Sequence, residues 1–138
     1  MPSLIYNSCL DDTVRGAIDF DTDTFKMILV TSSYTAAKTH AKRSDVTNEV
    51  SGTGYTTGGN AAAATCTKDN VNNREDITFA ITSWTTATIT ARAGVIYKSR
   101  GGLASADELV AYVDFGTDVT STAGTFSVTI SSPLRFQN

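Results

Sequence analysis

The chain has 138 residues, of which 41% are apolar and 18% are charged, and its formal net charge is −3. A chain of this length usually forms one domain and can bury a real core. The acidic balance argues against nucleic-acid binding, because phosphate groups are bound by clustered basic side chains. The one basic stretch, 38–43, is followed at once by Asp45 and Glu49, so we expect it to be solvated. We therefore expect a single domain over residues 1–138 with no nucleic-acid partner.

The first residues predict an extended N-terminal arm, residues 1–8, followed by one short helix. Ser8 is placed to cap this helix, Asp11 and Asp12 to lie near its positive end, and Gly16 to stop it. The start of the chain lacks the basic residues and the apolar stretch of a signal peptide. No apolar run approaches the length of a membrane span, so we expect no membrane partner and synthesis in a cytoplasm.

Residues 25–31 carry apolar side chains on both faces, which predicts a buried strand. The next segment, residues 32–60, is polar and glycine-punctuated, and we expect a long loop with one helical turn at 44–50. Irregular segments of this length inside compact domains are usually functional. A weak strand at 61–67 and a polar loop at 68–76 follow.

A strand with one buried face is predicted from Ile77, because Ile77, Phe79 and Ile81 alternate with Thr78, Ala80 and Thr82. A further alternating stretch runs over 86–91. At the centre of the chain, two β-rich runs at 92–98 and 109–115 predict an antiparallel pair. Their apolar residues occupy both faces: the pattern places Leu109, Ala111, Val113 and Phe115 on one, and Val110 and Tyr112 on the other.

A loop at 118–124 and a half-buried strand at 125–130 come next, and Leu134 and Phe136 are expected to close the sheet. About one residue in six is threonine, which suits half-buried pleated surfaces. Six to eight strands with almost no helix predict an all-β fold. We expect an antiparallel β-sandwich, jelly-roll or immunoglobulin-like, with at most one short N-terminal helix.

Candidate catalytic and metal-binding groups are few. The single histidine, His40, would have to serve any histidine-dependent catalysis, and a lone loop histidine is usually exposed and inert. Asp19, Asp21 and Asp23 have the spacing of a calcium loop, but the glycine and glutamate that this loop requires are missing. The two cysteines, Cys9 and Cys66, are too few for a disulfide scaffold, so we expect free thiols. We expect no enzyme activity, no metal and no cofactor.

Aromatic and glycine residues in the long loop are the candidate contacts with other molecules. Tyr34 and Tyr55 are expected to be exposed there, and with Trp84 they are the candidates for a sugar-stacking platform. Flexible glycine-rich segments can dock by becoming ordered on binding. The candidate interface residues are Tyr6, Tyr34, Tyr55, Gly52, Gly54, Gly58 and Gly59.

Several segments, taken in order, carry a resemblance to known proteins: Ile5-Tyr-Asn-Ser8, Gly16 to Lys26, Glu49 to Gly59, Thr88 to Arg92, Val95 to Lys98, Tyr112 to Gly116 and Gly124 to Ile130. Together they resemble a group of small β-rich structural proteins of tailed bacteriophages. The usually acidic, aromatic stretch before Glu49 is here the basic stretch 38–43.

The resemblance implies a non-enzymatic protein of the virion, made in the host cytoplasm. A capsid decoration or cement protein that contacts the major capsid protein fits best, and homo-oligomers are expected. The alternatives are a head–tail connector or tail-associated protein, or a carbohydrate-binding receptor module.

Overall fold

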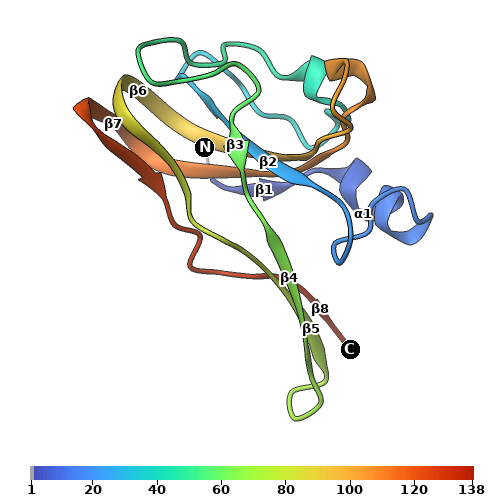
Figure 1. The fold of residues 1–138 in the computed structure, drawn as a ribbon. Coiled ribbons are helices and arrows are strands. Elements are labelled where there is room, and N and C mark those ends of the chain that lie inside the picture. Colours follow the sequence, from blue (N-terminus) through green and yellow to red (C-terminus); the bar gives the residue numbers. More distant parts are fainter. Residues whose placement is uncertain (1) are drawn as a thin grey trace.

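The computed structural model describes residues 2–138. It contains two antiparallel sheets and one short α-helix, which confirms the predicted all-β fold (Figure 1). The five-stranded sheet has the order β1-β7-β6-β2-β3, and the three-stranded sheet has the order β4-β5-β8. The elements are β1 (Leu4–Ile5), α1 (Asn7–Val14), β2 (Phe25–Val30), η1 (Arg43–Asp45), β3 (Asn60–Ala61), β4 (Ala64–Asp69), β5 (Arg74–Phe79), β6 (Thr82–Lys98), η2 (Ala104–Ala106), β7 (Leu109–Val128) and β8 (Leu134–Gln137).

The N-terminal helix begins without the predicted side-chain cap but ends just before Gly16, as predicted. It starts at Asn7 and no side chain caps it; Ser8 lies inside the helix, and its hydroxyl reaches the backbone oxygen of His40 at 3.5 Å. No acidic residue lies in the first turn, so the predicted placement of Asp11 and Asp12 is wrong. The chain does reverse at Gly16, whose φ of +79° favours glycine.

The two longest strands form the antiparallel pair at the centre of the large sheet. β6 joins the shorter strands predicted at 86–91 and 92–98. β7 joins those predicted at 109–115 and 125–130 and runs through 118–124, so the loop predicted there is wrong. Register shifts absorb the extra residues: Ala93 pairs with Asp114, whereas Ala91 pairs with Val119. Threonines can continue such a ladder because they tolerate one solvated face.

A bulge at the start of β7 exchanges two side chains between the faces of the sheet. Tyr97 pairs with Leu109 and Ile96 pairs with Ala111, which leaves Val110 as the extra residue. Leu109 therefore packs on the face opposite to Ala111, and the prediction that both share a face is wrong.

Apolar side chains cover both faces of the large sheet, as predicted for β2. Met27 and Leu29 point into one cluster, and Ile28 and Val30 point into the other. The second cluster also takes in Tyr34 and other residues of the long loop.

The loop of residues 32–60 is therefore packed against the large sheet, although its glycine-rich sequence favours a flexible segment; a role of this loop in docking stays a prediction. Val50 is buried, Val30 bridges to Glu49, and Thr53 bridges to Thr88 of β6. Its helical turn is η1, at the start of the predicted range.

The three-stranded sheet, which we call the projecting sheet, extends away from the large sheet in Figure 1. β4 and β5 are joined by residues 70–73, so the predicted polar loop at 68–76 is mostly strand. β8 pairs with β5 and closes this sheet, as expected for the C-terminal residues. Ile81 does not continue the buried face of β5, because its side chain is 60% exposed.

Candidate interaction surface

The tyrosines that the sequence offers as contacts lie inside the fold. The hydroxyls of Tyr6 and Tyr34 are 3.0 Å apart, and that of Tyr34 is hydrogen bonded to Nδ1 of His40 at 2.9 Å. Tyr6 is 0% exposed and Tyr34 is 5% exposed, so the expectation of an exposed contact at Tyr34 is wrong. Burial raises the pKa of Tyr6. These three side chains hold the N-terminal segment against the long loop.

Tyr55 is half-buried and fixes the second part of the loop. Its hydroxyl donates to Glu49 at 2.7 Å and accepts from the backbone amide of Leu29 at 3.1 Å. Its ring stacks on Trp84, with 5.8 Å between ring centroids. Because Trp84 is 1% exposed, the three aromatic residues considered for sugar stacking do not form an exposed platform.

The loop glycines allow the backbone to approach the sheet closely. A Cβ on Gly59 would lie 1.8 Å from the backbone oxygen of Met27, and one on Gly54 would lie 2.7 Å from that of Thr86. Both residues have positive φ. The amide of Gly58 donates to Glu49 at 2.8 Å, and Gly52 remains exposed. A role for these glycines in binding a partner stays a prediction.

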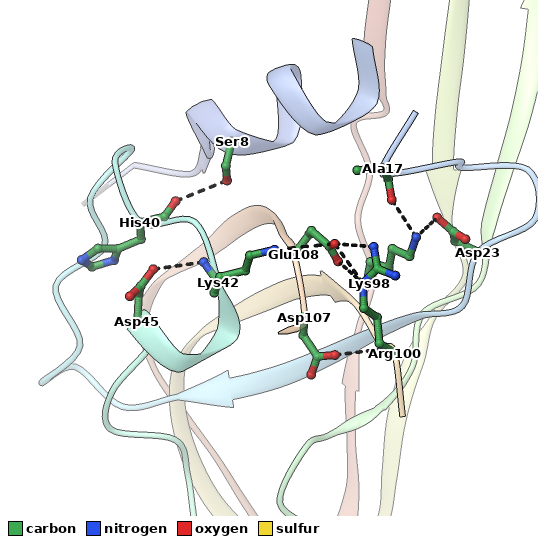
Figure 2. Close-up of polar contacts among 10 residues, drawn as sticks. All are labelled: Ser8, Ala17, Asp23, His40, Lys42, Asp45, Lys98, Arg100, Asp107 and Glu108. Atoms are coloured by element: carbon green, nitrogen blue, oxygen red, sulfur yellow. Dashed lines mark hydrogen bonds and ion pairs between the residues drawn. The ribbon is translucent and has the colours of Figure 1, made fainter. Parts of the chain in front are cut away.

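A charged cluster lies where the β6–β7 connection meets the long loop (Figure 2). Glu108 accepts from Nε of Arg100 at 2.9 Å and lies 3.6 Å from the ammonium of Lys42. Burial would raise the pKa of Glu108, but the Arg100 hydrogen bond and the nearby cations outweigh it and hold the pKa below its ordinary value. The neighbouring Asp107 pairs with Arg43 at 2.8 Å.

A further ion pair in Figure 2 joins Lys98 to Asp23 at 2.8 Å, and Lys98 also donates to the backbone oxygen of Ala17. Each acid of this cluster is thus matched by a cation, and the cluster fastens loops to the sheet.

The carboxylates of the acidic turn at 19–23 accept hydrogen bonds from backbone amides of the same turn. The amide of Asp19 donates to Asp23 at 2.8 Å, and the amide of Asp21 donates to Asp19 at 2.9 Å. Among residues 2–138, no group of three or more acidic, histidine or cysteine side chains could hold a metal ion. Cys9 is buried, Cys66 is exposed, and both are free thiols, as predicted.

An open groove of about 950 Å³, lined mostly by apolar residues, lies beside β1 and β7, and sequence reasoning did not find it. Its lining comes from three parts of the chain: Leu4 and Ile5 of β1, Val113 and Phe115 of β7, and Phe79 and Leu134 of the projecting sheet. β1 pairs with only two residues of β7, so this edge of β7 is largely open beside the groove. Such a surface suits an extended or flat protein partner.

No family model matches the chain, and neither the curated proteins nor the solved structures contain a match. None of the helices formed by residues 2–138 has the length and apolar character needed to cross a membrane.

Proposed function

We propose that the chain is a non-enzymatic structural protein of a bacteriophage virion, a decoration protein that stabilises the head by contacts with the major capsid protein. The observation that carries the proposal is the projecting sheet beside an open apolar groove. A neighbouring protein can cover both of these surfaces. The resemblance of the sequence to bacteriophage structural proteins favours a virion as the assembly in which this happens. Many weak contacts on a symmetric shell then act together with high avidity.

The polar groups of the chain also support a structural role. The single histidine is hydrogen bonded to Tyr34, and the buried acids Asp107 and Glu108 are each paired with arginine. Such pairs hold a backbone in place.

The test is the copy number of the chain in purified particles of the phage that encodes it, measured by quantitative mass spectrometry. We expect on the order of hundreds of copies per particle, as for a component repeated over a shell. About a dozen copies or fewer would instead place it in a connector or tail. Absence from the particles would refute a virion role.

A further inference from the structure

One edge of β7 has no partner strand beyond β1. β1 pairs only with Ala111 and Tyr112. Further along β7, residues 117–122 run between Gly116 and Ala123, whose positive φ interrupts the extended backbone at both ends. In the described part of the chain, no strand lies beside residues 117–122 on the side opposite to β6. We call this side of residues 117–122 the open edge.

The strand register shows which backbone groups the open edge presents. The amide of Thr88 donates to the backbone oxygen of Thr53 at 2.9 Å, so the backbone groups of Thr88 face away from β7. Those of Thr90 face the same way, because backbone direction alternates along a strand. Thr90 pairs with Thr120, and opposite residues of an antiparallel pair either bond each other or both face away. Thr120 therefore directs its amide and carbonyl to the open edge.

The sequence of this region lacks the residues that commonly protect exposed edges. Residues 117–130 contain no proline, lysine or arginine, and their one acid, Asp118, lies 3.4 Å from Arg92. Folded proteins usually place charges or proline on a long exposed edge, or cover it. An ordered row of backbone donors and acceptors is matched by one kind of occupant, an extended segment with the same groups.

The groove lies on one face of the open edge. Val119 pairs with Ala91 of the first apolar cluster, and opposite residues share a face, so Val119 points to the side of that cluster. Val119 is 39% exposed, and it lines the groove together with Phe115. A strand added at the open edge would turn every second side chain toward this face. The occupant is therefore expected to alternate apolar and polar residues.

A second copy of the chain is a poor occupant of this site. Residues 117–122, at about 3.3 Å each, form an edge about 20 Å long, and a sheet is about 10 Å thick with its side chains. Two such edges side by side would bury roughly 400 Å² in all, which is within the range of crystal contacts. On the groove face the edge also offers only Val119 and the polar Ser121. A narrow segment is instead enclosed by the edge and by the groove lining.

We propose that the open edge and the groove bind an extended segment of a partner protein, which adds to the large sheet as a further strand. The backbone of the segment pairs with that of Thr120, and its apolar side chains cover Val119 and Phe115. The proposal goes beyond a place in a virion, because it states how a partner is held and applies to any assembly. Copy number in particles tests the one, and peptide binding tests the other.

The probe is a library of displayed peptides of about twelve residues, selected on the purified chain. We expect the enriched peptides to alternate apolar and polar residues, and the best of them, made synthetically, to bind with a dissociation constant of roughly 1–100 µM in calorimetry. A library that yields no such peptide would overturn the proposal.

Two methylated forms of the selected peptide test backbone pairing. Each form carries N-methyl groups on every second residue, in one register or the other. Only one set of peptide amides faces β7, so one form should lose binding and the other should keep it. Equal effects of the two forms would mean that the peptide is not bound as a strand.

Hydrogen exchange, followed residue by residue by nuclear magnetic resonance, tests the edge itself. In the free chain the amide of Thr120 should exchange about tenfold or more faster than those of Val119 and Ser121, which bond to β6. The selected peptide should slow the exchange of Thr120. Slow exchange of Thr120 in the free chain would show that the edge is already paired, against the proposal.

The decisive variant is Thr120→Pro, which removes the outward amide and leaves the bonds to β6 in place. It should weaken peptide binding about tenfold or more, because a backbone hydrogen bond is lost and the ring blocks the edge. The matched control is Leu103→Pro, at an exposed loop residue whose φ of −70° suits proline, and it should bind as the unchanged chain does. Equal binding by both variants would refute the proposal. Should circular dichroism show Thr120→Pro unfolded, the methylated peptides and the exchange of Thr120 decide.

Discussion

Removing the hydroxyl of Tyr55 tests whether the long loop is part of the folded core. Tyr55→Phe keeps the stacking on Trp84 but deletes two hydrogen bonds, one to Glu49 and one from the amide of Leu29. Leu29 is 0% exposed, so its amide is left buried without this acceptor.

The expected loss follows from these two contacts. An unsatisfied buried donor costs about 1–3 kcal/mol, and a hydrogen bond to a charged group is worth about 1.5–3 kcal/mol. Glu49 keeps the amide of Gly58 and Tyr55 is only half-buried, so we take the lower values and expect a total of about 2–3 kcal/mol. For a domain of this size the melting temperature should fall by roughly 6–15 °C.

Urea unfolding followed by circular dichroism measures this loss, and Tyr112→Phe is the matched control. Tyr112 is 3% exposed, and its hydroxyl makes no hydrogen bond within the described residues. The control should therefore lose less than about 0.5 kcal/mol of unfolding free energy. Equal stabilities for the two variants would mean that the loop does not pack against β2 as described.

Three further outcomes follow from single positions. Gly59→Ala should unfold the chain or lower its melting temperature by more than Tyr55→Phe does, because its Cβ would overlap the backbone oxygen of Met27; calorimetry checks this. The folded-state pKa of Glu108 lies below the unfolded value, so the unfolded chain binds more protons and stability should fall as the pH drops below about 4.5. Glu108→Gln should flatten that slope in urea unfolding at pH 7, 4 and 3. Burial raises the pKa of Cys9 to about 11, so a thiol reagent at pH 8 should label only Cys66 until the chain is unfolded.

The strands that the sequence predicts best are those with an apolar pattern of their own. Residues 25–30 and the pair centred on 92–98 and 109–115 appear where expected, because side-chain alternation reports burial directly. The projecting sheet shows this signal only in part: the strands expected at 61–67 and from Ile77 overlap β4 and β5, whereas the strand residues at 68–69 and 74–76 were expected in a loop. Lys68 and Glu75 are cross-strand partners in it, and a sheet that is exposed over much of its surface can be built from polar residues.

The buried positions of Tyr34 and Tyr55 were also beyond local reasoning. Tyr34 lies among small and polar residues and Tyr55 among glycines and threonines. The hydroxyl of Tyr34 nevertheless meets that of Tyr6, 28 residues earlier, and the hydroxyl of Tyr55 meets the amide of Leu29, 26 residues earlier. Residues so far apart in the sequence meet only in the folded chain, so local patterns do not reveal these contacts. The groove could not be predicted for the same reason, because its lining residues are spread from Ser3 to Leu134.

The two sheets differ in how much they depend on neighbours. The large sheet has an apolar cluster on each face, and residues of the long loop pack into both; Ile77 and Leu134 of the projecting sheet complete one of them. The projecting sheet buries Ile77 and Leu134 at its base and leaves Phe136 partly in water. A three-stranded sheet gains its stability from the apolar surface that it covers, so the tip of this one gains most when another protein lies against it. Any protein that binds the folded chain over Phe136 would therefore also stabilise it.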